Sequence, residues 1–492
     1  MHDQNGSVIL QPGRTCWRIE RAERFALIVD AAEYFAAFRS AMQQARHCVM
    51  MIGWEFDTRI SLDPRDDSGK VPDRLGRFLS WVVRQNPDLK ILMLEWDIGM
   101  IRTLGRGSTP LRIADWVAGS RISLKLDGAH PAGAAHHQKI VVIDEVLAFC
   151  GGIDMTADRW DTRAHPDRSD LRRRPTTRRH FGPWHDAMVA VDGDAARALG
   201  QLARERWTRA TNSEIAPPPA VPPAWPKSLP TSLENVDVAI SRTAPEFDGR
   251  DAVHEIEALY LDIIAATRRS LYIESQYFAS RKLAEAMVDR LREADGPEIV
   301  VINPETADGW LQEEVMGSSR ARLLGMIRQE DRHGRFRIYT PVAEEGTPIY
   351  VHAKIVVMDD RLLRIGSSNL NNRSLGFDTE CDLSVEARPD DPDDAKLRRQ
   401  IAALRNDLLS EHLGVTVEEF ETALAREDHS LIGAIETLRG TGRTLVPFTP
   451  PELNRIEDAV LGESDLLDPE RPARRWRSLR PRRLLSRVLA SS

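Results

Sequence analysis

The chain has 492 residues, of which 42% are hydrophobic and 29% are charged. This composition is typical of a globular protein with two or three domains and excludes a chain that is mainly disordered. The four cysteines lie far apart and form no C-x-x-C pair, a pattern that indicates neither a zinc cluster nor a disulfide framework.

The charge is distributed unevenly along the chain. Residues 471–492 contain eight arginines and no acidic residue, so the net charge of -8 for the whole chain becomes -16 for the other 470 residues. Proteins that bind nucleic acids usually carry positive charge across the binding domain, and we therefore expect no nucleic-acid partner. The sequence shows no signal-peptide pattern and no apolar run long enough to span a bilayer. We expect a cytoplasmic protein, with peripheral contact to a membrane as an open alternative.

The first predicted elements are a helix and a strand within residues 34–56. This segment aligns without gaps with residues 256–278, and in both an amphipathic helical period precedes a short run typical of a strand. A second pair of segments, 136–144 and 351–359, also aligns, 215 residues apart. The chain therefore contains an internal duplication.

A linker is predicted between the two copies. Residues 210–235 contain seven prolines, which favour extended structure over regular pairing. Each copy alternates helical segments with short branched apolar segments, so the sequence predicts an α/β fold in which helices flank a mixed β-sheet. The predicted units are residues 1–209, the linker 210–235, residues 236–465 and a basic tail, 466–492.

The aligned segments 136–144 and 351–359 share a charged motif beside a run of branched apolar residues. In each, a histidine is followed two residues later by a lysine and five residues after that by an aspartate. In a strand, the histidine and the lysine would project on the same side, while the apolar run is buried among neighbouring strands. Each aspartate falls at the turn that follows, where its predicted task is structural or orienting. The candidate catalytic residues of the two motifs are His137, Lys139, Asp144, His352, Lys354 and Asp359.

Two such motifs facing one another suit the chemistry of a phosphodiester. One histidine would attack phosphorus and form a covalent phosphohistidine, and the other, protonated, would donate to the departing oxygen. The lysines would hold the non-bridging oxygens, a task that magnesium performs in other phosphoryl-transfer enzymes, so we expect no metal and no cofactor. A lone histidine is more often a packing residue, and a histidine–aspartate cluster can bind a metal, but the duplicated spacing favours catalysis and the lysines would repel a cation.

At these residues the chain resembles the phospholipase D superfamily, whose signature is the duplicated H-x-K-x4-D motif. The resemblance covers most of residues 20–425 and extends to several other segments that look like the eukaryotic-type branch. These segments are 148–161, 182–186, 273–278, 365–380 and 408–414. The resemblance implies two α/β domains related by pseudo-twofold symmetry, with one active site at their interface.

The resemblance also implies roles for individual residues, which the motif alone leaves symmetric. His137 would be the nucleophile and His352 the general acid, with Lys139 and Lys354 on the phosphate. Three further residues would line the pocket, and two acids would orient the imidazoles. The pocket residues are Gly152, Ser367 and Asn369, and the acids are Glu380, toward His137, and Asp186, toward His352.

The activity that this resemblance implies is that of a phospholipase D. Such an enzyme cleaves the distal phosphodiester of a glycerophospholipid at a membrane surface, with water or an alcohol as acceptor, and we expect it to act as a monomer. A cardiolipin synthase-like phosphatidyltransferase and a nuclease of the same superfamily are the alternatives, and a scaffold with a degenerate site is disfavoured because both motifs are intact. The arginine-dense insertion 162–182 is predicted either to contact anionic headgroups or to be a solvated, mobile loop. The tail 471–492 is predicted either to be an interfacial segment attracted to acidic lipid or to be disordered.

Overall fold

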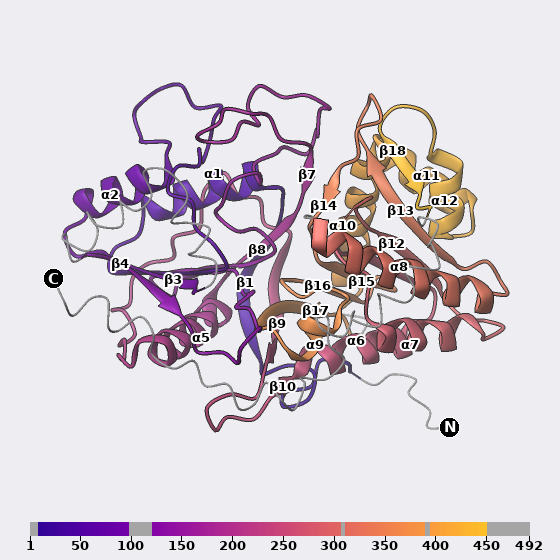
Figure 1. The fold of residues 1–492 in the computed structure, drawn as a ribbon, viewed down its shortest axis with the longest axis horizontal. Coiled ribbons are helices and arrows are strands. Elements are labelled where there is room, and N and C mark those ends of the chain that lie inside the picture. Colours follow the sequence, from indigo (N-terminus) through magenta and orange to yellow (C-terminus); the bar gives the residue numbers. More distant parts are fainter. Residues whose placement is uncertain (1–7, 98–120, 307–309, 389–393, 450–492) are drawn as a thin grey trace.

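A large mixed sheet organises the described part of the chain. The computed structural model describes residues 8–97, 121–306, 310–388 and 394–449. The centre of the sheet is an antiparallel pair formed by β1 (Arg18–Val29) and β9 (Leu233–Ala244). One half of the sheet extends outward from each member of this pair (Figure 1).

The two halves of the sheet repeat the same strand order. From β1 the order is β8 (Ala187–Asp192), β6 (Leu147–Gly151), β5 (Ile140–Ile143), β2 (Cys48–Gly53), β3 (Lys90–Trp96) and β4 (Ile122–Asp127). From β9 the order is β17 (Glu380–Glu386), β16 (Leu362–Gly366), β15 (Ile355–Met358), β11 (Ser270–Glu274), β12 (Glu298–Ile302), β13 (Phe336–Val342) and β18 (Thr444–Pro447). In both halves the neighbours β2–β3–β4 and β11–β12–β13 are parallel, whereas the other neighbours are antiparallel.

Two short pairings lie outside this order. Strand β10 (Val253–His254) pairs with β9. Strand β7 (Trp184–His185) pairs in parallel with β14 (Tyr350–Val351), and this second, two-stranded sheet joins the two halves directly ahead of Asp186 and His352.

Helices cover both faces of the sheet. One apolar cluster continues across both halves and includes residues of α5 (Gly193–Thr211), α10 (Ala395–Leu413), α11 (Val417–Arg426) and α12 (Leu431–Leu438). A second cluster packs α1 (Ala31–Met42) and α2 (Leu75–Gln85) on the first half. A third packs α6 (Glu255–Ala266), α7 (Arg281–Leu291) and part of α8 (Trp310–Glu330) on the second half, where the short α9 (Asn372–Gly376) also lies. The four residues of β5 and the four of β15 are all buried, because both faces of these central strands are covered.

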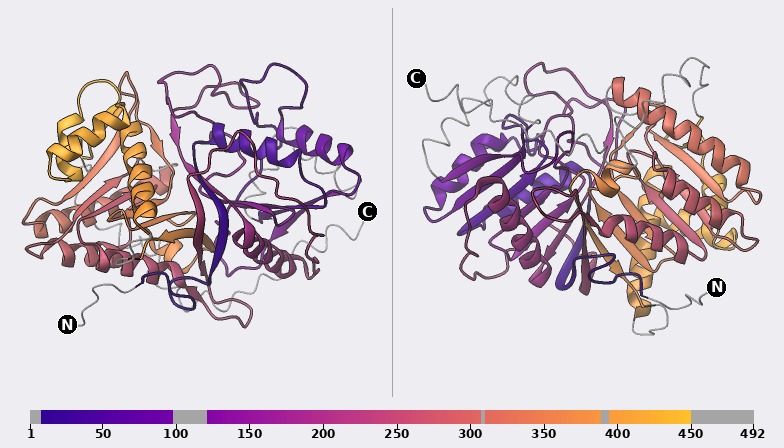
Figure 2. Two further views of the ribbon diagram at one scale, coloured as in Figure 1. Left: turned by 180° about the vertical axis from the view of Figure 1, so that it is seen from behind. Right: turned by 60° about the horizontal axis from the view of Figure 1, so that its bottom comes forward.

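The predicted fold class is confirmed. The helix and strand expected within residues 34–56 are α1 and β2, and their counterparts within 256–278 are α6 and β11. The views in Figure 2 show two lobes that meet along the β1–β9 pair. Residues 212–232, which contain all seven prolines of the predicted linker, form neither helix nor strand. Since the sheet is continuous across both halves, the exact unit boundaries stay a prediction.

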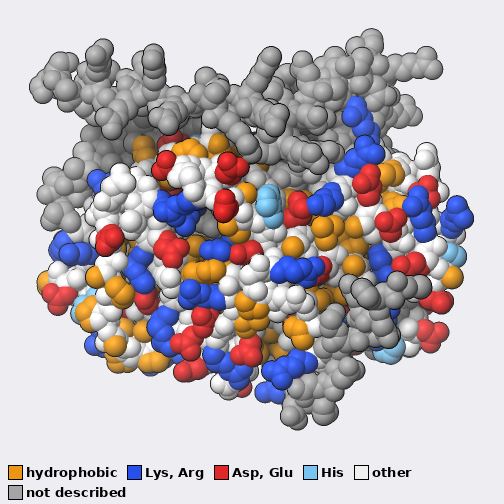
Figure 3. Space-filling model, turned by 90° about the horizontal axis from the view of Figure 1, so that it is seen from below, with side chains coloured by type: hydrophobic (Ala, Val, Ile, Leu, Met, Phe, Trp, Pro, Cys, Tyr) orange, Lys and Arg blue, Asp and Glu red, His pale blue; other side chains and the backbone are white. Residues whose placement is uncertain are grey.

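The surface charge, the helices and the arginine-rich segments bear on the predicted contacts with nucleic acid and with membranes. On the face drawn in Figure 3, acidic, basic and apolar side chains are interspersed. Among the described residues, none of the helices combines the length and the apolar character that crossing a bilayer requires. The insertion 162–182 is partly packed, because Arg172 is fully buried and bonded to Asp161. The basic tail, 466–492, lies outside the described residues.

Candidate active site

The two charged motifs are held by the opposite halves of the molecule. His137 and Lys139 precede β5 in an irregular extended segment and are not part of the strand, contrary to the expectation from sequence. The main-chain N–H of His137 donates to the carbonyl of Thr379 in the second half (3.0 Å). The main-chain N–H of His352 donates to the carbonyl of His185 in the first half (2.8 Å). Each histidine is therefore anchored by main chain from the other copy.

Each histidine also meets a buried carboxylate from the other half. The Nδ1 atom of His137 lies 3.0 Å from Oε2 of Glu380, at the start of β17. The Nδ1 atom of His352 lies 2.7 Å from Oδ2 of Asp186, between β7 and β8. Both carboxylates lie at the histidines to which the resemblance assigns them. Because Nδ1 of each ring is bound in this way, Nε2 of each ring is the atom left for chemistry.

The two lysines lie in the same site but have different partners. The Nζ atom of Lys139 lies 3.1 Å from Oδ2 of Asp154, and both side chains are buried. The Nζ atom of Lys354 donates to Oε1 of Gln276, a neutral amide, at 3.4 Å. The charges of both lysines lower the pKa of His137, and the charge of Lys139 lowers the pKa of Lys354. The structure thus brings both motifs together.

Burial sets the protonation of the imidazoles. It lowers the pKa of His137 well below its usual value, and the neighbouring Lys139 and Lys354 act in the same direction. It also lowers the pKa of His352, with Lys354 adding to the effect and Asp186 opposing it. The lowered pKa of His137 favours its uncharged form, which a nucleophile requires.

The other charged groups of the site respond differently to burial. Burial lowers the pKa of Lys354 to about 7. It raises the pKa of Glu380 to about 8 despite hydrogen bonds from Ser367 and Ser374. Burial also acts to raise the pKa of Asp186, but the His352 imidazole and the Lys354 ammonium outweigh it, and the result is a pKa of about 2. The two histidine–acid pairs therefore differ in charge state although they share a geometry.

The three predicted pocket residues have distinct surroundings. A Cβ atom on Gly152 would lie 2.2 Å from Oδ1 of Asp186, so the glycine provides the room that this carboxylate occupies. The Ser367 hydroxyl donates to Glu380, which makes it a support for the acid. The Oδ1 atom of Asn369 is buried without a hydrogen-bond partner among the described residues, so it remains available to a bound group.

The carboxylates of the two motif aspartates bind main-chain N–H groups. The carboxylate of Asp144 accepts the main-chain N–H groups of Arg46, His47 and Cys48 at 2.6, 2.8 and 2.8 Å. The carboxylate of Asp359 makes the equivalent three contacts with residues 268–270, at 2.5, 2.7 and 2.8 Å. Placing them in the candidate catalytic set is thus corrected: each binds main-chain N–H groups at the start of β2 or β11, which is the structural task also considered from sequence.

Several residues beside the motifs were missed from the sequence. Asp154, the partner of Lys139, lies 215 positions before Asn369, and aligning residues 148–155 with 363–370 would have identified it. Gln276 lies within the segment 273–278 that was noted only for its resemblance. The Arg159 guanidinium lies 4.1 Å from the ring centroid of Trp184, whose ring lies 5.3 Å from that of His352.

The chain is similar to several known proteins. The family model described as "Cardiolipin synthase, PLD-like domain" matches residues 260–403. Phospholipase D A of Dictyostelium discoideum is 25% identical over 463 residues, which cover 79% of this chain and 35% of that protein. Phospholipase D1 of Schizosaccharomyces pombe is 22% identical over 84% of this chain and 38% of that protein. The chain thus spans little more than a third of either relative.

A solved structure shares the fold. The crystal structure of a phosphatidylserine synthase from Haemophilus influenzae superimposes with a TM-score of 0.53 over 84% of this chain and 95% of that chain. The sequence identity is 14%, so this likeness concerns the fold alone. It extends over both halves of the sheet.

Proposed function

Because the chain belongs to the phospholipase D superfamily, we propose that it hydrolyses the distal phosphodiester of glycerophospholipids, releasing phosphatidic acid and the headgroup alcohol. The observation that carries this proposal is the convergence of two histidine–acid pairs, each built from both halves, beside two buried lysines. The substrate would be a lipid at a membrane surface, and water or an alcohol would be the acceptor. The cytoplasmic location and the monomeric state stay predictions.

The first chemical step would transfer the phosphatidyl group to His137. Its neutral Nε2 atom attacks phosphorus and forms the P–N bond while the bond from phosphorus to the headgroup oxygen breaks. A protonated His352 donates its Nε2 proton to the departing oxygen, which leaves as the free alcohol. Asp186 at 2.7 Å stabilises the imidazolium of His352 at that moment.

The second step would return His137 to its free form. The now neutral His352 removes a proton from water, whose oxygen attacks phosphorus, and the P–N bond breaks to release phosphatidic acid. A primary alcohol in place of water gives a new phosphatidyl alcohol. In both steps the ammonium groups of Lys139 and Lys354 would bind the non-bridging oxygens and stabilise the charge that develops on them.

Phosphatidyl transfer is the second candidate. The family model that matches residues 260–403 carries the name of cardiolipin synthase, and the same phosphohistidine would serve if a lipid hydroxyl replaced water. A nuclease is disfavoured by the net charge of -16 outside the tail and by the mixed charge of the face in Figure 3.

Product analysis tests these alternatives. The protein would be incubated with fluorescent phosphatidylcholine, phosphatidylethanolamine or phosphatidylglycerol, with and without a primary alcohol, and separately with single-stranded DNA, and all products identified by mass spectrometry. We expect phosphatidic acid, and the phosphatidyl alcohol when alcohol is present, and no DNA cleavage. Cardiolipin as the main product from phosphatidylglycerol would favour the transferase.

Two variants test the mechanism. His137→Asn and His352→Asn should each lose turnover of the natural lipids, while His333→Asn, at an exposed histidine, should keep it. Full activity in both motif variants would contradict the proposal.

A further inference from the structure

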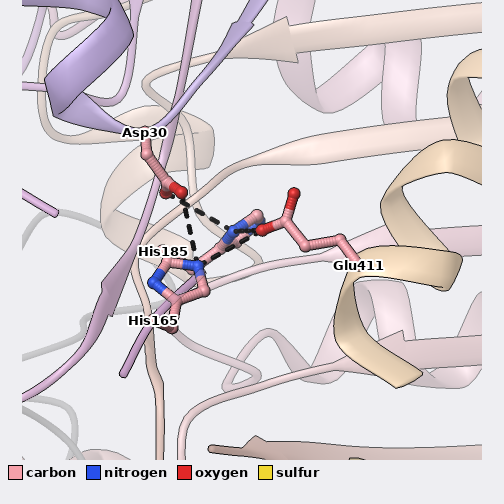
Figure 4. Close-up of side chains that lie close together, drawn as sticks. All are labelled: Asp30, His165, His185 and Glu411. Atoms are coloured by element: carbon pink, nitrogen blue, oxygen red, sulfur yellow. Dashed lines mark hydrogen bonds and ion pairs between the residues drawn. The ribbon is translucent and has the colours of Figure 1, made fainter. Parts of the chain in front are cut away.

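A second group of titratable side chains lies beside the candidate active site. Asp30, His165, His185 and Glu411 are all buried and converge from four different segments (Figure 4). Asp30 follows β1, His165 lies in the insertion 162–182, His185 is in β7, and Glu411 is near the end of α10. The first three come from the first half of the chain and the fourth from the second half. The proposed hydrolysis uses none of them.

The four side chains present one atom each to a common centre. The Nε2 atom of His165 lies 3.3 Å from Oδ2 of Asp30 and 3.2 Å from Oε1 of Glu411. The Nδ1 atom of His185 lies 3.6 Å from Oδ1 of Asp30 and 3.2 Å from the same glutamate oxygen. Tetrahedral Zn²⁺ with bonds of about 2.0 to 2.2 Å places its ligand atoms about 3.3 to 3.6 Å apart. The spacings of 3.2, 3.2 and 3.3 Å that involve Oε1 of Glu411 and Oδ2 of Asp30 lie close to this range, and one ligand atom from each of the four residues lies within 4.8 Å of the others.

The outer atoms of the histidines are arranged as they are at metal centres. The Nδ1 atom of His165 lies 2.9 Å from Oδ2 of Asp161, and the Nε2 atom of His185 lies 2.8 Å from Oε2 of Glu274. A carboxylate on the far nitrogen fixes the tautomer so that the inner nitrogen carries a lone pair toward a metal. The Oδ2 atom of Asp30 and the Nδ1 atom of His185 are buried polar atoms without a hydrogen-bond partner in the described chain, and both face the centre.

We propose that Asp30, His165, His185 and Glu411 bind one Zn²⁺ ion. Two imidazoles and two carboxylates in four-coordinate spacing suit zinc better than magnesium or calcium, which prefer six or more oxygen ligands. A closed shell of four protein ligands is typical of a structural zinc site, because a catalytic site keeps an open position. This proposed structural site is distinct from a catalytic metal at the two motifs, where the lysines would repel a cation.

The task of this ion would be to position the His352–Asp186 pair. The carbonyl of His185 accepts the main-chain N–H of His352 (2.8 Å), and Oδ1 of Asp30 accepts the main-chain N–H of Asp186 (3.1 Å). A metal that fixes Asp30 and His185 thus fixes the backbone on both sides of that pair. Through Glu411 it also joins α10 of the second half to the first half.

A neighbouring group of three residues is a weaker candidate for the same metal. His185, Glu274 and His412 lie together, but Glu274 already accepts the Tyr272 hydroxyl at 2.5 Å and contacts both histidines. Glu274 is therefore occupied as a partner that orients His185. The other competing occupant of the four-residue site is a pair of protons, which would convert both histidines to imidazolium ions bonded to the carboxylates.

Metal analysis of the full-length protein tests the proposal without reference to activity. We expect about one zinc per chain in the purified wild type by inductively coupled plasma mass spectrometry, and the visible absorption of tetrahedral cobalt after exchange with Co²⁺. Asp30→Asn and Glu411→Gln should each lower zinc affinity at least about 10-fold. His412→Gln, which alters only the neighbouring group, should keep the zinc. Added zinc should raise the thermal unfolding midpoint of wild type more than that of Asp30→Asn.

Three results would overturn the assignment. A wild-type protein with neither bound zinc nor a tetrahedral cobalt spectrum after titration would show that protons fill the cluster. Zinc retained at wild-type affinity in both Asp30→Asn and Glu411→Gln would show that the ligands are wrong. Zinc lost from His412→Gln but kept by the other two would assign it to the neighbouring group. Metal content is measured on each variant as purified, with circular dichroism to verify its fold.

Discussion

The two halves of the candidate active site share a motif but differ in what surrounds it. In the first half, Lys139 is paired with the carboxylate of Asp154 at 3.1 Å. In the second half, the Lys354 ammonium contacts, among the described residues, the neutral amide oxygen of Gln276 and the main chain of its own motif, and burial lowers its pKa to about 7. The position equivalent to Asp154 in the second half is Asn369, which carries no charge.

This difference shows what duplication supplies and what it leaves to be decided. The repeated strand order places two imidazoles and two ammonium groups at one site, but it gives no reason for one histidine to attack and the other to donate a proton. Residues outside the motif break that symmetry. Glu380, with a pKa raised to about 8 by burial, accompanies His137, while a carboxylate with a lowered pKa accompanies His352.

The largest expected effect is a difference between the His137 and His352 variants on a substrate whose leaving group needs no proton. From a phosphatidyl ester of p-nitrophenol, the leaving group is nitrophenolate, which departs without taking up a proton. Its release therefore needs a nucleophile but no general acid. His352→Asn should release a burst of about one nitrophenolate per enzyme, because His137 still attacks. His137→Asn should show no burst and react at least about 100-fold more slowly in the first turnover. Stopped-flow absorbance measures both quantities.

The assignment of different roles to the two histidines is wrong if, of the two variants, the burst is not confined to His352→Asn. Equal bursts in both variants would make the histidines interchangeable, and a burst in His137→Asn alone would reverse their roles. Wild type with the same ester is the reference for burst amplitude. Circular dichroism of both variants verifies that the fold is retained.

The sequence predicts the architecture of each half better than the way in which they join. Helical and strand periods are local patterns, so α1 with β2 and α6 with β11 could be predicted from segments of 23 residues. The pairing of β1 with β9 joins residues more than 200 positions apart, and no local period encodes it. The continuous sheet is therefore visible only in three dimensions.

The same distinction holds for the site. The histidines and lysines are recognisable because the motif occurs twice with fixed spacing, and Asp186 and Glu380 because of their resemblance to known segments. Asp154 occupies the position that Asn369 has in the second copy, so aligning the two copies could have drawn attention to it. The contacts of Asp154 and Gln276 with the lysines have no signature in one sequence. The cluster around His185 is assembled from four separate segments, so it could not be foreseen either.

A smaller effect is expected from pH. The Lys354 ammonium is charged below its pKa of about 7 and loses its charge as the pH rises through that value, so phosphate binding should weaken. Because kcat/KM reports the free enzyme, we expect it to fall by up to about tenfold per pH unit above about pH 7. In Lys354→Arg the guanidinium stays charged, and this fall should disappear. The measurement is a pH profile of lipid hydrolysis.

Lys139→Arg is the matched variant for this profile. It changes the same kind of residue in the other half, so its profile should keep the alkaline fall of wild type even if its absolute rate is lower. The shape of each profile is compared, because both substitutions alter the fit to phosphate. An unchanged fall in Lys354→Arg would show that another group causes it.

The smallest effect on activity is expected at the two motif aspartates. Their substitution should lower the stability of the protein, by a larger amount in the first half than in the second. Asn tolerates the positive φ at Asp144 and Asp359 (49° and 51°), so substitution removes charge without adding backbone strain. Asp144 is 3% exposed and its carboxylate binds three main-chain N–H groups, so Asp144→Asn should lower the unfolding free energy by about 2 to 3 kcal/mol. Asp359 is more exposed, and Asp359→Asn should cost about 1 kcal/mol. Urea denaturation measures both losses. The kcat of the folded variants should stay within about threefold of wild type, since the described contacts of both carboxylates are to main-chain N–H groups and not to the imidazoles of His137 and His352. A loss of kcat near that of the histidine variants would return these aspartates to the catalytic set.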